Sequence, residues 1–434
     1  MSPDRTPTTT PVLVAAAGAA WEAQALERLR RGGSGIVLAK RCVDLSELLA
    51  TASTGMASVA VVAPTLPGLD ADSVAALRRA GLGVVLVAEP EELLDGDTAR
   101  LRRLGLEHLL PSTGLDRLVA TVTDASASAV PSGRSAPGDH LGAGTAAGAV
   151  RATPGRVVAV WGPTGAPGRT TVAVGIATEV ARAGRETLLV DADAYGGAVA
   201  QHLGVLDEVS GLLAAARAAN TGRLDAERLA ALARQVDGGL RVLTGLPRPD
   251  RWPEVRPTAF ADLLDEAARL AQVMVLDLGF SLETGPVDPF GSSAPQRNEM
   301  TLASLEGADE VVVVGAADPV ALARLARALV ELGDVLPGVR PRVVVNRTRP
   351  SLGWSDREIR GMVEGFARPV DVHFLPDDRP AADRALMAGQ SLAECGDSPL
   401  RTAMSDLAHG LLGDAVPPPS RGRRVRRRRA GRDR

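Results

Sequence analysis

Cysteine, aromatic residues and lysine are all scarce in this chain of 434 residues. Two cysteines, Cys42 and Cys395, are too few for a disulfide framework and lack metal-site spacing, which favours a reducing cytoplasm. Aromatic residues make up 2% of the chain, which argues against stacking platforms for single-stranded nucleic acid. Lys40 is the only lysine. No apolar run reaches the ~20 residues of a membrane span, and the first ten residues lack the features of a signal peptide.

The net charge of −3 is unevenly distributed along the chain. Residues 421–434 contain nine arginines and one aspartate, so they carry +8 while the rest of the chain carries −11. We expect 414–434 to be a disordered, Arg-rich tail. The tail has no amphipathic apolar face, and its charge suits an anionic membrane surface and the phosphates of nonspecific DNA equally well.

Apolar runs alternate with amphipathic segments in two separate parts of the chain. After a disordered start over 1–10, residues 11–125 contain five short apolar runs and predict a small, doubly wound parallel sheet. Residues 126–154 are rich in Ala, Gly, Ser and Pro and predict a flexible linker. Seven further runs in 155–413 are mostly uninterrupted, which predicts a larger α/β domain whose mostly parallel sheet is buried on both faces.

The segment VVAVWGPTGAPGRTTVA (157–173) predicts a strand, a glycine-containing loop and a helix. Backbone N–H groups in such a loop, backed by a helix N-terminus, can hold an anion. Gly165 and Gly168 allow a phosphate to approach, and Thr170, followed by Thr171, offers a hydroxyl for Mg²⁺. Arg169 stands where a P-loop has lysine. Alone, the loop matches a phosphate-binding loop weakly, and an ordinary strand–helix turn explains it as well.

Acidic residues end two of the later predicted strands. Asp191 and Asp193 follow LLV, and Asp277 closes VMVLD. The carboxyl ends of parallel strands meet at one edge of a sheet, so these side chains are expected near the loop. A phosphate–Mg²⁺ site needs such acids. Each one alone could be a turn former or a helix cap, whereas three in this order favour a site.

With these motifs in place, 155–413 resembles the MinD/ParA branch of P-loop ATPases. The resemblance includes VVVNR, with Asn346, and FLPDDRPAADRALMAGQSL, which is similar to the proline–aspartate segment that these proteins place near the adenosine. It implies ATP and Mg²⁺ as cofactors. The roles that it implies are metal binding by Thr170, Asp191 and Asp277, positioning of the attacking water by Asp193, and adenosine contacts from Asn346, Pro376 and Asp378.

This chain departs from the family pattern at the residues that do the chemistry. The family's loop reads KGGxGK[ST], whereas TGAPGRTT places Thr164 at the first lysine, Ala166 at a glycine and Arg169 at the second lysine. Arginine keeps the charge but is not equivalent to lysine. Losing one group that stabilises a transition state costs about 3 kcal/mol. We therefore expect nucleotide binding with weak or absent hydrolysis, in which Asp193 and Arg169 are the catalytic candidates.

The N-terminal part looks like a receiver domain that cannot be phosphorylated. Its first strand ends in Ala15, Ala16 and Ala17 instead of acids, and Ala63 occupies the phosphoacceptor position. Without acids neither Mg²⁺ nor phosphate can be held. A docking or dimerisation module fits 11–125 better, and an unrelated small α/β domain remains the alternative. An inactive receiver before an ATPase is similar to the CpaE/TadZ subgroup of pilus-assembly and septum-site proteins.

Two functions from different classes follow. The first is an ATP-binding spatial regulator that positions a pilus, a secretion machine or the division septum. It would act as a nucleotide-dependent homodimer with protein partners, in the cytoplasm or at the inner face of the membrane or cell pole. The alternative is a nucleotide-independent scaffold that keeps only the fold. A metabolic enzyme is disfavoured because the five histidines are scattered and form no cluster with cysteine.

Overall fold

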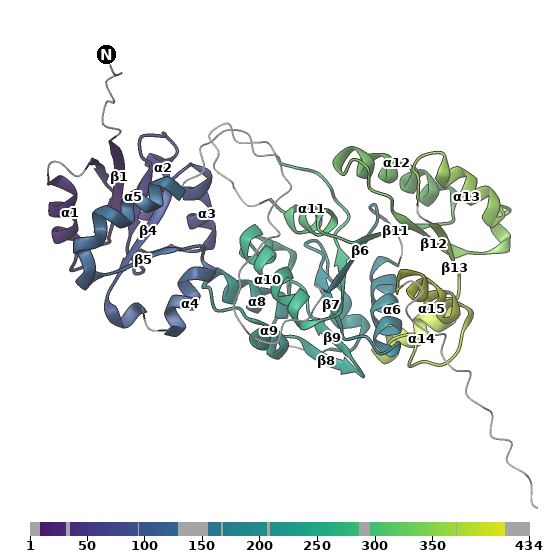
Figure 1. Ribbon diagram of the computed structural model, residues 1–434. Helices are drawn as coiled ribbons and strands as arrows, with labels where there is room; N and C mark the ends of the chain where they lie inside the picture. The colour runs from purple at the N-terminus through teal and green to yellow at the C-terminus, as the bar shows by residue number, and fades with distance from the viewer. Residues whose placement is uncertain are drawn as a thin grey trace, which may run out of the picture.

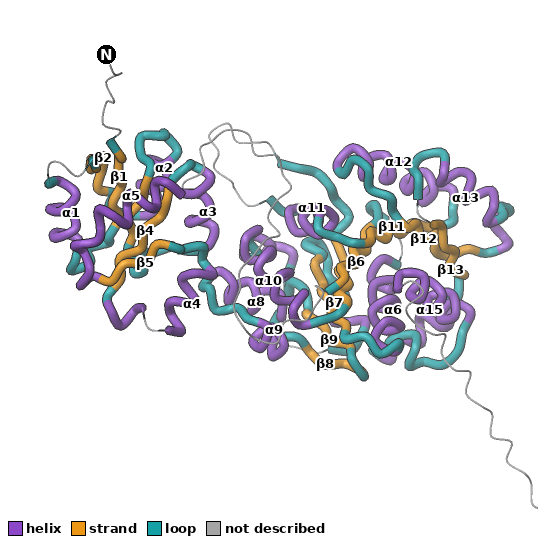
Figure 2. The backbone as a smooth tube through the Cα atoms, in the orientation of Figure 1, coloured by secondary structure: helices purple, strands orange, loops and turns teal. Residues whose placement is uncertain are grey.

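The computed structural model describes residues 9–31, 35–93, 95–128, 155–165, 168–205, 209–285, 296–369 and 371–412, the side chains of 95–97 and 99 excepted. These residues form two mostly parallel sheets with helices packed on their faces (Figures 1 and 2). The predicted α/β fold class is therefore confirmed. None of the helices described is long and apolar enough to cross a membrane.

The N-terminal unit, residues 9–128, is built on a parallel sheet with the strand order β2-β1-β3-β4-β5. This is the order of flavodoxin-like folds. Helices α2, α3 and α4 cover one face of the sheet, and α1 and α5 cover the other. The elements are β1 (Thr10–Ala15), α1 (Glu22–Arg30), β2 (Ile36–Arg41), α2 (Leu45–Ala52), β3 (Val59–Val62), α3 (Ala71–Arg79), β4 (Gly83–Ala88), η1 (Pro90–Leu93), α4 (Asp95–Arg103), β5 (His108–Pro111), η2 (Ser112–Arg117) and α5 (Leu118–Ser128).

The C-terminal unit, residues 155–412, contains an eight-stranded sheet with the order β13-β12-β11-β6-β10-β7-β9-β8. Its strands are β6 (Arg156–Trp161), β7 (Thr187–Ala192), β8 (Arg234–Asp237), β9 (Leu240–Leu243), β10 (Val273–Leu278), β11 (Glu310–Ala316), β12 (Arg342–Thr348) and β13 (Asp371–Pro376). Its longer helices are α6 (Arg169–Arg182), α8 (Gly211–Asn220), α10 (Pro257–Leu270), α12 (Pro319–Val335) and α15 (Pro399–Leu412). The shorter ones are α7 (Val199–His202), α9 (Ala226–Leu232), η3 (Pro249–Glu254), α11 (Glu299–Glu306), η4 (Pro350–Leu352), α13 (Asp356–Glu364) and α14 (Arg379–Ala388).

Two apolar layers bury the central strands of this sheet. Side chains from α8, α10 and α12 pack on one face around Trp161 and Phe260. Side chains from α6, α14 and α15 pack on the other face around Ile176 and Met404. Because β6, β7 and β10 are covered on both faces, only the strand ends are open to a ligand.

Strand β8 pairs antiparallel with β9 at the edge of the sheet and was not predicted from the sequence. Three of its four residues are polar, so it carries none of the apolar run that marked the other strands. The signal that was present is the turn Asp237-Gly238-Gly239, because such dipeptides favour tight hairpins.

Two predicted segment boundaries differ from the structure, one at the end of helix α5 and one at the start of strand β1. Helix α5 continues to Ser128, so the first three residues of the predicted 126–154 linker are helical, because Val122 and Ala125 carry its apolar face into the core. Thr10, placed in the disordered start, already belongs to β1. The remaining linker residues, residues 1–8, Ala166 of the loop and the tail from 414 onward lie outside the described residues.

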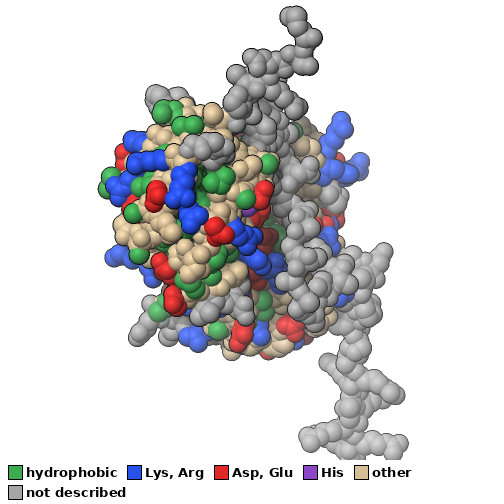
Figure 3. Space-filling model, turned by 60° about the vertical axis from the view of Figure 1, so that its left-hand side comes forward, with side chains coloured by type: hydrophobic (Ala, Val, Ile, Leu, Met, Phe, Trp, Pro, Cys, Tyr) green, Lys and Arg blue, Asp and Glu red, His purple; other side chains and the backbone are tan. Residues whose placement is uncertain are grey.

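Ion pairs join the N-terminal unit to the C-terminal unit. At the start of α10, Arg256 Nη1 lies 2.7 Å from Asp70 Oδ2 and 3.3 Å from Asp72 Oδ2, and the Thr258 hydroxyl donates to the same Asp72. The N-terminus of α3, where both acids lie, is thus tied to the N-terminus of α10. More generally, basic and acidic side chains are interspersed on the face of the molecule in Figure 3.

A second contact places α4 against the turn between α8 and α9. Arg100 Nε donates to the carbonyl of Thr221 at 2.7 Å, and Arg103 Nη1 donates to the carbonyl of Gly222 at 3.1 Å. Gly222 has φ +66°, and a Cβ there would lie 2.7 Å from the carbonyl oxygen of Arg100. Glycine is therefore needed at 222 for two reasons, its left-handed backbone and the closeness of α4.

Replacing this glycine is expected to loosen the contact between the units. Gly222→Ala and Gly184→Ala both force alanine into a left-handed backbone, at roughly 1–2 kcal/mol each, but a Cβ at Gly184 meets nothing within 4 Å. We expect faster amide hydrogen exchange in α4 in Gly222→Ala than in Gly184→Ala. Equal exchange in the two variants would show that the close approach at 222 does not hold the units together.

Candidate functional site

The loop between β6 and α6 has a backbone that only glycine adopts readily. Gly165 has φ +69°, and Gly168, the residue that caps α6, has φ +96°. A Cβ on Gly168 would overlap the side-chain amide nitrogen of Asn346. The loop therefore turns tightly into the helix and lies directly against the end of β12, as an anion-binding loop requires.

Arg169, the first residue of α6, folds back over this loop. Its Nη1 donates to the carbonyl of Gly162 at 3.1 Å, and its Nη2 donates to Asp193 Oδ2 at 3.3 Å. Both side chains are largely buried, with exposed fractions of 17% and 10%. The two residues named as catalytic candidates are thus brought together, but they neutralise one another.

Asp191 and Asp277 form a buried acidic pair at the adjoining strand ends. They lie opposite each other in the register of β7 and β10, and each residue is 1% exposed. Asp191 accepts from the backbone N–H of Val199 at 3.1 Å and of Asp193 at 3.3 Å. The Thr170 side chain is hydrogen bonded to Asp277, whose Oδ2 has no hydrogen-bond partner among the described residues.

The pKa values of both carboxyls are raised. Burial, and after it the charge of Asp277, raises the pKa of Asp191 to about 8. Burial raises the pKa of Asp277 to about 7, although the Thr170 hydroxyl and the Arg169 charge act in the opposite direction. Two such acids side by side are costly for the folded protein unless a cation joins them.

The oxygen atoms of these side chains suit an Mg²⁺ ion that is also coordinated by a phosphate. Thr170, Asp191 and Asp277 offer hard oxygen ligands, and the unpartnered Asp277 oxygen leaves a free acceptor for a metal-bound water. Within the described ranges, no group of three or more His, Cys, Asp or Glu side chains could hold a metal ion. Because Mg²⁺ is commonly held by one or two carboxylates plus substrate phosphates, this site would be completed by a ligand.

A cavity of about 240 Å³ lies beside the helix end of the loop. Among the residues that line it are Gly168, Thr171, Asn346, Pro376 and Asp378. All five were assigned to nucleotide contacts from the sequence, and they lie together on this side of the site. Asp378 caps α14 through one oxygen, while its Oδ2 is buried without a partner among the described residues. The cavity thus combines apolar walls with amide and carboxylate groups, as nucleotide-base sites do.

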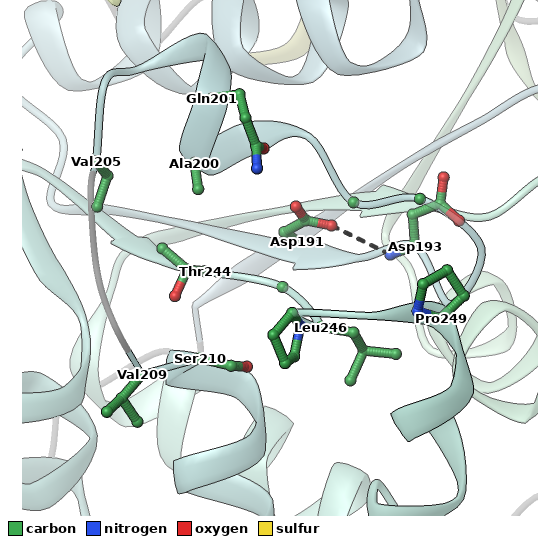
Figure 4. A pocket seen from close by; sticks show the side chains of 14 residues that line it. Asp191, Asp193, Ala200, Gln201, Val205, Val209, Ser210, Thr244, Leu246 and Pro249 are labelled. Atoms are coloured by element: carbon green, nitrogen blue, oxygen red, sulfur yellow. Dashed lines mark hydrogen bonds between the residues drawn. The ribbon is translucent and has the colours of Figure 1, made fainter.

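A second cavity, of about 190 Å³, opens beside the acids (Figure 4). Asp191 and Asp193 line one side of it, and Ser210 and Thr244 line the other. A Cβ on Gly197 would lie 2.5 Å from the Asp191 carboxylate, so close packing surrounds that group. Two of the acids, Asp191 and Asp193, thus border this cavity, whereas Asp277 does not line it.

A network around Tyr195 was missed by the sequence analysis. The Tyr195 hydroxyl donates to Asn298 Oδ1 at 2.7 Å, and Arg297 lies 3.9 Å above the Tyr195 ring. Arg297 also donates to the carbonyl of Ala194 at 3.0 Å. These contacts tie the segment after β7 to the segment after β10. The sequence offered one signal, since Tyr195 is the only tyrosine and follows Asp193 by two residues.

Comparison with known proteins gives similarity of fold at low identity. No family model matches the chain, and no curated protein matches it. A ParA family ATPase from Chlorobium tepidum TLS is 22% identical, with a TM-score of 0.48, over 58% of this chain and 98% of that one. The MinD septum site-determining protein of Pyrococcus horikoshii OT3, complexed with Mg-ADP, is 15% identical, with a TM-score of 0.47, over 59% and 95%.

A third similar structure is an McdA–ATP complex from Cyanothece. It is 14% identical, with a TM-score of 0.45, over 59% of this chain and 97% of that one. Identities below 25% and TM-scores below 0.5 establish neither family nor function. The geometry of the loop, the acids and the cavity is therefore what supports a ligand site here.

The buried acids give a pH-dependent prediction. A carboxyl whose pKa is higher in the folded state favours folding at low pH, and that contribution is lost as pH rises from about 4 to about 7. In metal-free protein at pH 8, Asp277→Asn should therefore raise the stability by at least about 1 kcal/mol, with little difference at pH 4. Thermal unfolding at both pH values measures this, with the exposed Asp334→Asn as control. A lower melting temperature for Asp277→Asn at pH 8 would contradict the account.

Proposed function

We propose that this protein binds ATP with Mg²⁺ at the carboxyl edge of its second sheet and acts as a spatial regulator of the MinD/ParA type. The observation that carries the proposal is the buried, unpartnered oxygen of Asp277 beside Thr170 at the start of the loop helix. A loop that served only as a turn would gain nothing from two costly buried acids next to it. A metal–phosphate ligand removes that cost.

The chain supplies a separate group for each part of the nucleotide. Asn346, Pro376 and Asp378 in the cavity would take the base. The backbone N–H groups from Gly168 onward and the N-terminus of α6 would take the phosphates. Thr170, Asp191 and Asp277 would hold Mg²⁺, which when bound neutralises phosphate charge.

Turnover in the proposed function is weak. Asp193, the candidate for orienting the attacking water, is paired with Arg169, the candidate for stabilising phosphate charge. A phosphate must compete with Asp193 for the guanidinium before either side chain can act. Arginine also presents a planar fork where a compact ammonium would reach one oxygen. Binding, rather than hydrolysis, would therefore carry the signal.

In this proposal the protein is a cytoplasmic homodimer of the CpaE/TadZ type. Its protein partners would belong to a pilus, secretion or division machine, at the inner face of the membrane or the cell pole. Residues 11–125 would be a receiver-like docking module without a phosphoacceptor, because Ala63 holds that position. The arginines of 421–434 would add attachment to anionic lipid or DNA.

Equilibrium binding of ATP and ADP, with and without Mg²⁺, tests the proposal. We expect binding that depends on Mg²⁺ and is lost in Asp191→Ala, with thermal unfolding showing that the variant is folded. Asp334→Ala, at an exposed position, serves as the matched control. No binding to folded wild-type protein at millimolar nucleotide would reject the proposal and favour the nucleotide-independent scaffold, in which Arg169 and Asp193 simply hold the loop closed.

Restoring lysine at the loop should raise turnover. In Arg169→Lys the ammonium can reach a phosphate oxygen without holding Gly162 and Asp193 together, so Asp193 is released. We expect phosphate release to increase about 10-fold, which corresponds to about 1.4 kcal/mol of transition-state stabilisation. Arg182→Lys, at the exposed far end of the same helix, should leave the rate unchanged. An unchanged or lower rate in Arg169→Lys would show that the Arg169–Asp193 pair does not limit turnover.

A further inference from the structure

A second arginine lies at the loop, and it comes from a different part of the chain. Arg324 is on α12, which follows β11, and β11 pairs with β6 through Val312 and Val160. This pairing brings the first turns of α12 next to the loop that follows β6. A Cβ on Gly165 would overlap Nη1 of Arg324, so the guanidinium is in contact with the loop backbone.

Arg324 differs from Arg169 in having no acidic partner among the described residues. Its side chain is exposed, and it makes no ion pair or side-chain hydrogen bond among the described residues. Arg169 is held by Asp193 and the Gly162 carbonyl. Among the residues that the structure describes, an anion that arrives at the loop therefore meets one guanidinium without an ion-pair partner, Arg324, and one that is already paired, Arg169. A guanidinium forms paired hydrogen bonds to phosphate oxygens, which makes the free one a strong phosphate ligand.

The position along the loop indicates which part of a nucleotide Arg324 would touch. Gly168 and Thr171 line the cavity proposed for the base, whereas Gly165 lies three residues earlier in the loop and is not among the lining residues. A nucleotide with its base in that cavity extends its phosphates along the loop, away from Thr171. The contact at Gly165 is thus on the side of the terminal phosphates.

We propose that Arg324 binds the terminal phosphates of the nucleotide and provides, from within the same chain, the free positive charge that this loop lacks. The inference rests on the proposed function, because it assigns a residue to the same site. It predicts a specific pattern: Arg324 contributes to affinity for ATP and ADP and contributes little for AMP, whose single phosphate lies near the base.

The test compares Arg324→Ala with Arg327→Ala in the full-length protein. Arg327 lies on the same exposed stretch of α12, and its Nε donates to the carbonyl of Ala323 within its own helix. Kd values for ATP, ADP and AMP are measured in the presence of Mg²⁺. We expect Arg324→Ala to weaken ATP binding about 10-fold or more, as the loss of a charge-assisted phosphate contact does. AMP binding should change less than about 3-fold, and Arg327→Ala should match the wild type.

Each other outcome has a definite meaning. An unchanged ATP affinity in Arg324→Ala overturns the assignment while leaving nucleotide binding intact. Equal losses for ATP, ADP and AMP also overturn it, because they mean that Arg324 only supports the loop. Arg324→Lys separates charge from shape and should recover part of the ATP affinity. A wild-type protein that binds no nucleotide rejects the proposed function itself, and this assignment with it.

Discussion

Two carboxylates buried side by side are the constraint on which the rest of this structure depends. Asp191 and Asp277 are opposite each other on neighbouring strands, and both are almost fully removed from water. Burial makes the ionised pair unfavourable, and the raised pKa values express that cost. Space for the carboxylates comes from Gly197 and Gly245, where a Cβ would lie 2.5 Å from an atom of the Asp191 carboxyl group. Such a pair is consistent with a site that is completed by a cation.

The two arginines at the loop, Arg169 and Arg324, differ in whether an acidic side chain among the described residues is paired with them. Arg169 is close to the acids, but it forms an ion pair with Asp193, which neutralises its charge. Arg324 contacts the loop backbone at Gly165 and has no ion-pair partner among the described residues. In the proposed function, Arg324 would hold a phosphate, whereas Arg169 would restrain Asp193, the candidate for orienting the attacking water.

Much of the fold followed from local pattern because its strands are uninterrupted apolar runs and its helices are amphipathic. The placement of Asp191 and Asp277 followed from one rule, that parallel strands end at the same edge. The hydrogen bond from Arg169 to Asp193 could not be predicted, since it depends on a rotamer. The bond between Tyr195 and Asn298 joins residues 103 positions apart, and no local motif marks it.

The contact between the two units was equally hidden from the sequence. Arg256 and Asp70 are 186 positions apart, and the capping box that Asp70 forms with Ser73 marks only the start of α3. Strand β8 was missed because edge strands need no apolar run, although its glycine turn was visible. What sequence pattern conveys here is burial and strand direction. What it does not convey is the pairing of charges across the fold.

The most direct test of the central claim uses Mn²⁺ in place of Mg²⁺, with electron paramagnetic resonance to count free and bound metal. The account holds that the acid pair and the phosphates form the cation site together. It therefore predicts that Mn²⁺ stays free with protein alone and becomes bound when ADP is added, and that Asp277→Asn weakens the binding. Tight Mn²⁺ binding without nucleotide, or binding with ADP that is no stronger than to ADP in buffer, would contradict it.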